Sequence, residues 1–451
     1  MKLPKKFTKK QRELFAYGAS HPYSLLCADP RLGKSSVGIY LQKLRNVNTL
    51  IVCPSYLVLN WKREILKWSP NSDVTTFKKG SELYEPCATD FVVVSYNLVQ
   101  KAEYLFEWCD MAVFDEIHNL KTQSAKRTQF IHKAVYENSV KYVHGLTGTP
   151  LKNRVREFYS LLALMYYDPR LGEGISIEKA NTFSEFLGKN TPKVAKKHFL
   201  DLYPDEISFA ERFSYRQQYE VRVTTKKGAQ FRMPVVKYEG LRNIKELKYW
   251  LDGRYIRLRA DAGDLPPISY KDILISETPN KKLLSAFETF FEGEGMKSVK
   301  PDIKVQAALQ KVPFTIKYVE DLMESVECVL IYSDHKEPIK KIAAHFDAPC
   351  ITGATPGSKR AALVNDFQAG KLKILCSTIG ALKEGADLFR AKDIVLSDLC
   401  WVPGDLNQVI NRVRAIGQKD PRTVHRIFGS PQDEKIAEAL QTKMAVIDAA
   451  T

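Results

Sequence analysis

YSLLCADPRLGKSS, residues 23–36, is the stretch that decides the fold. The run YSLLCA has the length and β-rich apolar composition of a buried strand, and a loop ending in Gly33-Lys34-Ser35 follows it directly. Placed before a helix, such a loop can cradle phosphate groups with its backbone N–H groups. Lys34 would then neutralise the β- and γ-phosphates, and the Ser35 hydroxyl would bind Mg²⁺. The alternative interpretation is an ordinary basic helix start.

Short apolar runs alternate with helical stretches in two regions, which is typical of doubly wound parallel sheets. The expected strands are, in the first region, YSLLCA, NTLIVCP, DFVVVSY, MAVFDE and YVHGLTG, and in the second, ECVLIYS, APCITG, LKILCST, AKDIVLSD and TVHRIFG. Between the regions, YEVRVTTKKGAQFRMPVVKYEG predicts a strand, a turn and a second strand. We therefore expect an α/β protein of two lobes, residues 1–165 and 301–451. A helical and β-hairpin insertion, residues 166–300, would separate them, with a basic hairpin near 219–238.

Composition narrows the class of protein. The 451 residues carry a net charge of +16, which favours a polyanionic partner, most often nucleic acid, although simple solubility would also explain it. The chain has no apolar run long enough to span a bilayer, so we expect no membrane partner. We also expect no secretory signal, because no apolar segment follows the basic start. The eight scattered cysteines are expected to be reduced core residues, and a structural zinc site is not expected.

The apolar run MAVF is followed by DEIH, residues 115–118. Carboxylates at the end of a strand suit a nucleotide site, where Asp115 would hold Mg²⁺ and Glu116 would orient and deprotonate the attacking water. Adjacent strand residues point to opposite faces, so both reach one site only if the strand ends there. The alternative is a pair of solvated turn charges. His118 is interpreted as a polar relay or packed residue rather than a metal ligand.

Together with further segments, the phosphate loop and the DEIH segment resemble the motifs of a Swi/Snf-type superfamily two helicase, and the resemblance extends over most of the chain. The segments that carry the resemblance, in the family's order, are residues 50–70 (LIVCPSYLVLNWKREILKWSP), 93–99, 115–128, 146–165 (LTGTPLKNRVREFYSLLALM), 329–335, 351–368, 377–388 and 408–418 (QVINRVRAIGQ). The second lobe is similar to the annealing-helicase subgroup. Because little is left beyond the motor, the chain resembles a phage-encoded branch-migration helicase. The resemblance implies two RecA-like lobes.

The resemblance also implies ATP and Mg²⁺ as cofactors. Gln11 would recognise adenine, whereas its alternative is an exposed helix residue. Arg412 would be an arginine finger on the γ-phosphate. Thr147 and Thr149 would link the nucleotide site to the DNA track, or else cap a helix. The implied nucleotide-binding residues are Gln11, Asp29, Arg31, Gly33, Lys34, Ser35, Ser36, Gly385 and Asp387; Lys34, Asp115, Glu116, Arg412 and Arg414 would be catalytic, and Ser35 and Asp115 would bind the metal.

Two departures from the family pattern stand out. Arg31 replaces a glycine of the phosphate loop, so we expect that position to adopt a conformation open to other residues. Ala415 stands where the family has a second arginine, and we expect Arg414, one position earlier, to compensate in part.

DNA would be contacted mainly through its phosphates, without sequence preference. The candidate contacts are Ser55, Asn60, Trp61, Ser95, Tyr96, His335, Thr352, Gly353, Ser377, Thr378, Lys226 and Lys227. Capping is the alternative for the polar residues, and a core position is the alternative for Trp61. The basic hairpin would separate strands at a fork or junction, or else form a basic surface ribbon.

The sequence thus predicts a DNA-dependent ATPase, a translocase or helicase that hydrolyses ATP to ADP and phosphate. Its substrates would be duplex, forked or four-way DNA, in branch migration, fork unwinding or remodelling during replication, recombination or repair. We expect a monomer in the cytoplasm, either at a bacterial nucleoid or in a phage-infected host. The alternatives are a catalytically inactive ATPase-fold scaffold that binds DNA and a chromatin-type remodelling motor.

Overall fold

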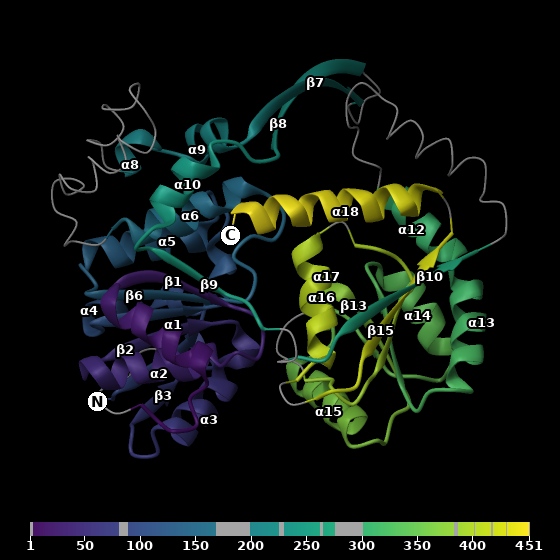
Figure 1. Cartoon of the computed structure of the whole chain (residues 1–451), viewed down its shortest axis with the longest axis horizontal. Helices are drawn as coiled ribbons and strands as arrows, with labels where there is room; N and C mark the ends of the chain where they lie inside the picture. The colour runs from purple at the N-terminus through teal and green to yellow at the C-terminus, as the bar shows by residue number, and fades with distance from the viewer. Residues whose placement is uncertain are drawn as a thin grey trace. The chain divides into compact units, whose positions relative to one another are not determined.

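The computed structural model describes residues 3–80, 89–167, 199–224, 230–261, 265–275, 301–382, 387–400, 402–415, 418–429 and 431–450 (Figure 1). The chain forms two compact units. The first comprises residues 1–215, 238–260 and 446–451, and the second comprises residues 216–237 and 261–445. Each unit is built around its own parallel sheet.

The first sheet has seven strands in the order β3-β4-β2-β5-β6-β1-β9, and every neighbouring pair is parallel. The strands are β1 (Tyr23–Ala28), β2 (Thr49–Cys53), β3 (Val74–Thr76), β4 (Phe91–Ser95), β5 (Met111–Asp115), β6 (Tyr142–Thr147) and β9 (Tyr255–Leu258). All carboxyl ends of a parallel sheet lie along one edge, where α/β proteins bind their ligands. The loops after β1, β5 and β6, which carry the predicted motifs, therefore emerge at the same edge.

Both faces of this sheet are buried, as its continuous apolar strands require. Alternate side chains of β1 enter different cores: Leu25 and Cys27 enter one, and Leu26 and Ala28 enter the other. The helices α1 (Lys9–Ser20), α2 (Lys34–Arg45) and α3 (Val58–Trp68) cover the second of these faces (Figure 1). The opposite face is covered by α4 (Tyr104–Trp108), α5 (Lys126–Glu137), α6 (Phe158–Met165), α8 (Phe199–Leu202), α9 (Glu206–Phe213) and α10 (Ile244–Leu251).

The second sheet has six strands in the order β10-β15-β14-β11-β13-β12, again all parallel. The strands are β10 (Ile268–Leu274), β11 (Val329–Ser333), β12 (Cys350–Ile351), β13 (Ile374–Thr378), β14 (Asp393–Leu396) and β15 (Arg422–Phe428). Its helices are α12 (Pro301–Gln310), α13 (Val312–Met323), α14 (Lys336–His345), α15 (Gly357–Gln368), α16 (Ile379–Leu382), α17 (Pro403–Ile410) and α18 (Pro431–Ala450). The predicted α/β fold class with two parallel sheets is confirmed.

The division of the chain differs from the predicted boundaries at 165 and 300. Part of the expected insertion completes the two sheets: β9 extends the first sheet beside β1, with Leu25 opposite Tyr255, and β10 extends the second sheet beside β15. At the other end, residues 446–451 group with the first unit. The difference at β9 and β10 arises because strand pairing between distant segments assigns them to a sheet, whereas Val446 and Ile447 at the end of α18 pack against the core of the first unit.

The two strands of the predicted strand–turn–strand are present. β7 (Tyr215–Thr224) and β8 (Gln230–Glu239) pair as a two-stranded sheet. The expected turn residues Lys226 and Lys227 lie outside the described residues.

The cysteines agree with the expectation of reduced core residues. Seven are described, all free, and all but the half-buried Cys350 are buried. No helix in the described part of the chain combines the length and apolar character needed to cross a bilayer.

Candidate active site

The phosphate loop connects β1 to α2 and turns at Gly33. This residue occupies the left-handed region, at φ 80° and ψ 34°, as the N-cap of α2, and no side chain caps the helix there. A β-carbon on Gly33 would lie 2.0 Å from Gln11 Nε2. Glycine is thus required both by the backbone conformation and by the space. The uncapped helix start leaves backbone N–H groups for an anion, as a phosphate site requires.

Arg31 also has a positive φ, 73°. The expectation that this position avoids a glycine-like conformation is therefore wrong. The loop keeps the left-handed backbone that glycine adopts without strain, and arginine adopts it at a cost of about 1–2 kcal/mol.

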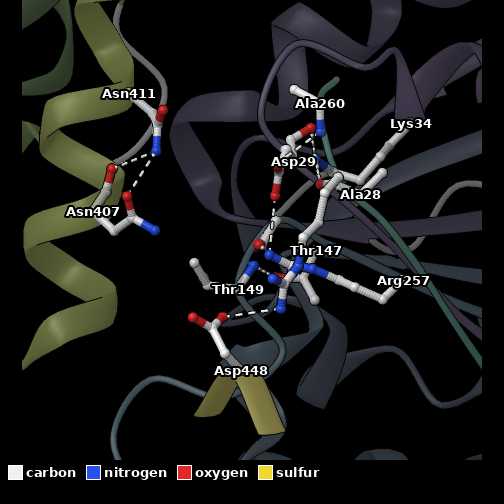
Figure 2. A network of polar contacts seen from close by, with 12 residues as sticks. Ala28, Asp29, Lys34, Thr147, Thr149, Arg257, Ala260, Asn407, Asn411 and Asp448 are labelled. Carbon is white, nitrogen blue, oxygen red and sulfur yellow. Dashed lines mark hydrogen bonds and ion pairs between the residues drawn. The ribbon is translucent and has the colours of Figure 1, made fainter. Parts of the chain in front are cut away.

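Lys34 opens α2 and folds back over the loop. Its Nζ donates to the carbonyl oxygen of Ala28 at 2.7 Å and, more weakly, to that of Asp29 at 3.4 Å (Figure 2). Burial lowers the pKa of Lys34, and the charges of Glu116 and Asp115 oppose that shift. The ammonium therefore lies within electrostatic reach of both predicted carboxylates.

Gln11 and Ser36 brace the loop from α1 and α2. Gln11 Nε2 donates to Ser36 Oγ at 3.0 Å, and the Ser36 hydroxyl donates to the Gly33 carbonyl at 2.7 Å. Gln11 is buried and forms a capping box with Thr8, accepting from the Thr8 N–H at 2.8 Å. The alternative of an exposed helix residue is therefore excluded, and Gln11 lies beside the loop where an adenine-reading amide is expected. Ser35 is half-buried in the first turn of α2.

The two carboxylates face one site because β5 stops between them. Asp115 is the last residue of β5, and Glu116 has a left-handed backbone at φ 51° and ψ 52°. The turn breaks the alternation that would send adjacent strand residues to opposite faces. Because the strand ends here, both carboxylates can reach one site, as the prediction for this pair required. The alternative, a pair of solvated turn charges, does not fit Asp115, which is buried.

Asp115 is held on three sides. Its Oδ2 accepts from Trp61 Nε1 at 2.7 Å, its Oδ1 accepts from the Glu116 N–H at 3.0 Å, and its carbonyl accepts from the Tyr96 hydroxyl at 2.9 Å. Burial, followed by the charge of Glu116, raises the pKa of Asp115 to about 7, while the bond from Trp61 lowers it. A bound cation would favour the ionised carboxylate further.

These contacts correct two of the predicted DNA contacts. Trp61 and Tyr96 are only 2% and 3% exposed, and both donate to Asp115. They therefore support the acidic residue from inside the unit instead of facing a nucleic acid. For Trp61 this is the core position named as its alternative.

Glu116 is joined to the loop after β6 through His118 and Thr147. The Thr147 hydroxyl donates to Glu116 Oε2 at 3.2 Å and accepts from the Thr149 N–H at 3.1 Å. His118 Nδ1 lies 3.0 Å from Thr147 Oγ1 and 3.2 Å from Glu116 Oε2. His118 is buried, which agrees with the packed residue named as one of its two interpretations; a role as polar relay stays a prediction. The DEIH and LTGTP segments thus form one hydrogen-bonded network.

Sequence reasoning missed Arg257, on β9. Its Nη2 donates to Asp29 Oδ1 at 2.9 Å, and its Nη1 donates to the Gly148 carbonyl at 2.7 Å (Figure 2). The alternating segment YIRL, residues 255–258, is a weak strand signal, but nothing in it indicates pairing with β1. Asp29, a predicted nucleotide-binding residue, is therefore bonded to an arginine more than 200 positions away.

In the second unit the structure brings two predicted segments together. The Leu388 N–H donates to the Arg412 carbonyl at 3.1 Å, which places the neighbouring Asp387 beside the helical turn of Arg412. Gly385 lies outside the described residues. Arg414 Nε donates to the Pro266 carbonyl at 2.8 Å, and its Nη1 donates to Asn411 Oδ1 at 2.9 Å. Arg414 thus holds the segment that enters β10, and its compensating role remains a prediction.

The other DNA candidates differ in exposure. Ser55 and Asn60 are exposed, whereas Ser95 is buried and its hydroxyl accepts from the Leu98 N–H at 3.3 Å. Buried Ser377 donates to the Ile351 carbonyl at 3.1 Å. The candidates on the second sheet follow or end neighbouring strands β11, β13 and β12 at one edge: half-buried His335, buried Thr352, exposed Gly353, and buried Ser377 and Thr378.

The donor set of the first unit fits ATP and Mg²⁺. An uncapped helix start and Lys34 suit phosphates, and the Asp115 carboxylate with the Ser35 hydroxyl suits a hard cation. Among the described residues there is no cluster of three or more His, Cys, Asp or Glu side chains that would hold a metal by itself.

The chain is similar to known proteins over two parts of its length. A family model described as SNF2-related domain matches residues 2–187, and one described as helicase conserved C-terminal domain matches residues 310–417. Among similar proteins, mouse DNA repair and recombination protein RAD54B is 23% identical over 94% of this chain and 51% of that protein. Bovine DNA annealing helicase and endonuclease ZRANB3 is 22% identical over 93% of this chain and 38% of that protein.

The SWI/SNF-related matrix-associated actin-dependent regulator of chromatin subfamily A-like protein 1 of Xenopus tropicalis is 24% identical over 97% of this chain and 44% of that protein. The chain therefore spans about half of these relatives or less. A solved structure, the Sulfolobus solfataricus SWI2/SNF2 ATPase core in complex with dsDNA, matches with a TM-score of 0.41 and 19% identity, over 98% of this chain and 92% of that chain. The chain thus carries a SNF2-related domain followed by a helicase conserved C-terminal domain.

Proposed function

We propose that the chain is an ATP-dependent DNA translocase that remodels or unwinds branched or forked DNA. The observation that carries the proposal is the assembly of Lys34, Asp115 and Glu116 at the carboxyl edge of the first sheet, with Thr147 bonded to Glu116. An anion-binding loop, a metal-binding carboxylate and a base together make a site for phosphoryl transfer to water.

Each residue is assigned one role in this proposal. Lys34 and the start of α2 would bind the β- and γ-phosphates, and Ser35 with Asp115 would hold Mg²⁺, which neutralises charge on the phosphates. Trp61 and Tyr96 fix Asp115. Glu116 would orient a water and accept its proton, and the network through Thr147 holds its carboxylate in place. Arg412 would stabilise the negative charge that develops during transfer.

DNA is proposed as the polymer partner on separate grounds. The net charge of +16 favours a polyanion. Relatives named for DNA repair, recombination and annealing support DNA. A contact made mostly to phosphates would be independent of sequence and strongly weakened by salt.

The test is steady-state ATP hydrolysis with single-stranded, duplex, forked and four-way DNA, and with RNA. We expect stimulation by DNA, greatest with branched forms, and a fall of about 100-fold or more for Lys34→Ala. Stimulation by duplex alone would favour a translocase without branch preference, the behaviour expected of a remodelling motor. Turnover that survives in Lys34→Ala would contradict the assigned site, and no turnover with any polymer would favour the inactive scaffold.

A further inference from the structure

The carboxylate of Asp29 is fixed by the end of a strand that no motif includes. Asp29 Oδ1 accepts from Arg257 Nη2 at 2.9 Å, and Oδ2 accepts from the Ala260 N–H at 3.0 Å. The Asp29 N–H in turn donates to the Leu258 carbonyl at 3.0 Å. The first residue of the phosphate loop is thus held through its main chain and through both side-chain oxygens (Figure 2).

Arg257 also reaches the loop after β6. Its Nη1 donates to the Gly148 carbonyl at 2.7 Å, between Thr147 and Thr149. The two loops are closely packed at this point, because a β-carbon on Gly148 would lie 3.3 Å from Pro30 Cδ. One guanidinium therefore joins the loop that binds phosphates to the loop whose Thr147 is bonded to Glu116.

The charge of Arg257 is placed to act at this site. The side chains of Arg257 and Asp29 are 15% and 26% exposed, so solvent screens their attraction only in part. Burial is the main cause that lowers the pKa of Lys34, and the charge of Arg257 adds to it. The guanidinium is therefore within electrostatic range of the residue expected to bind the β- and γ-phosphates. Without it, a bare carboxylate would stand in the loop that must receive an anion.

We propose that Arg257 is a positioning residue of the ATPase site, which locks the phosphate loop to the LTGTP loop and cancels the charge of Asp29 beside the triphosphate. The inference rests on the proposed ATPase function. It adds to the ATPase site a residue, Arg257, that lies outside the family motifs named in the sequence. Ala260, which completes the contact, is also the last residue before the chain passes into the second unit at Asp261.

The test compares Arg257→Ala, Arg257→Lys and Arg259→Ala in steady-state ATP hydrolysis with saturating duplex DNA. Arg259 is the matched control: it lies two positions further along and pairs with Asp448 at 3.0 Å, with both side chains about half exposed. We expect Arg257→Ala to raise KM for ATP roughly tenfold, the loss typical of one charge-assisted hydrogen bond, with a smaller change in kcat. A lysine restores the charge but lacks the planar fork whose two nitrogens bond separately to Asp29 and Gly148, so the KM of Arg257→Lys should lie between that of the unsubstituted protein and that of Arg257→Ala.

A second variant separates positioning from general damage. Asp29→Asn keeps the shape of the side chain and removes the charged acceptor, so it should also raise KM, and the double variant with Arg257→Ala should be no worse than the worse single variant. Unfolding temperatures of all variants, measured with and without Mg²⁺-ATP, show whether folding is retained. The inference is overturned if Arg257→Ala behaves like Arg259→Ala, or if the effects of the two substitutions simply add.

Failure of the inference is distinguishable from failure of the proposed function. Equilibrium binding of a fluorescent ATP analogue does not require turnover. If the unsubstituted protein binds the analogue but hydrolyses no ATP, the proposed function fails, while a roughly tenfold weaker binding by Arg257→Ala still supports the positioning role. Equal binding by both proteins overturns it.

Discussion

At the scale of single residues, the site depends on side chains whose roles are fixed by burial. Trp61 and Tyr96 lie in segments where the sequence predicts DNA contacts, yet both are buried and donate to Asp115. The spacing of a motif shows that its residues matter, but it does not show whether a given side chain faces solvent or the sheet. That difference is set by tertiary packing on α3 and the loop after β4.

Trp61→Phe keeps an aromatic side chain in the core and removes the indole N–H that donates to Asp115. Because a hydrogen bond to a charged group contributes about 1.5–3 kcal/mol, we expect ATP turnover to fall at least tenfold and the Mg²⁺ concentration for half-maximal turnover to rise. The measurement is a Mg²⁺ titration of ATP hydrolysis.

Trp68→Phe is the control, because Trp68 lies on the same helix and donates to Glu64 at 3.0 Å. An unchanged Mg²⁺ requirement in Trp61→Phe would remove the role assigned to this bond.

Arg31→Gly should stabilise the first unit. Arginine holds a left-handed backbone at φ 73°, and glycine relieves that strain by about 1 kcal/mol. Thermal unfolding should show a raised midpoint for Arg31→Gly but not for Arg31→Ala, which removes the guanidinium and keeps the β-carbon. An equal rise in both would show that the side chain, and not the backbone, is the source of the cost.

At the scale of elements, the strands that are long and apolar were predictable. All ten strands expected for the two parallel sheets are present, because each is an apolar run of the kind that a parallel sheet with two covered faces requires. The short β3 and the edge strands β9 and β10 were not predicted. β9 and β10 carry charged residues such as Arg257 and Lys271, and their place in a sheet is decided by pairing with partners more than 150 positions away. Asp29 was predictable as part of the loop, but Arg257 was not, because its function appears only with that pairing.

Helix α18 is anchored at its start by a buried ion pair. Lys311, between α12 and α13, donates to Asp433 Oδ1 at 2.5 Å, and Asp433 Oδ2 accepts from the Gly429 N–H at 2.9 Å. Lys311 and Asp433 are both buried. Lys311→Met should destabilise the second unit by about 3–5 kcal/mol, because it removes the ammonium that compensates the charge of a buried carboxylate.

The measurement is chemical denaturation followed by a probe in the second unit. The double variant Lys311→Met with Asp433→Leu removes both charges and should recover most of the loss. A double variant as unstable as the single one would show that the pair's hydrogen bonds, and not its unpaired charge, set the cost.

At the scale of the whole molecule, the two parallel sheets and the two matched domains follow the same order along the chain. The sequence predicted this organisation because the phosphate loop, the acidic pair and the apolar strand runs occur in the order and at the spacing of the family that the chain resembles. It did not predict the domain limits, since residues 238–260 return to the first unit after the hairpin.

The hairpin of β7 and β8 supplies a test of strand separation. Deleting residues 224–230 should leave DNA-stimulated ATP hydrolysis intact and abolish unwinding of a forked substrate, because a wedge is needed to part strands and not to bind ATP. Both activities are measured on the same fork. Equal loss of the two would favour the alternative, a basic ribbon that packs the protein.

The central claim is that Lys34, Asp115 and Glu116 form one ATPase site, with Glu116 as the base. Its most direct test is Glu116→Gln, measured both for binding of a fluorescent ATP analogue and for turnover with saturating DNA. We expect retained binding and a loss of turnover of about 100-fold or more, the range expected when a general base is removed. Turnover within a few-fold of the unsubstituted protein would contradict it.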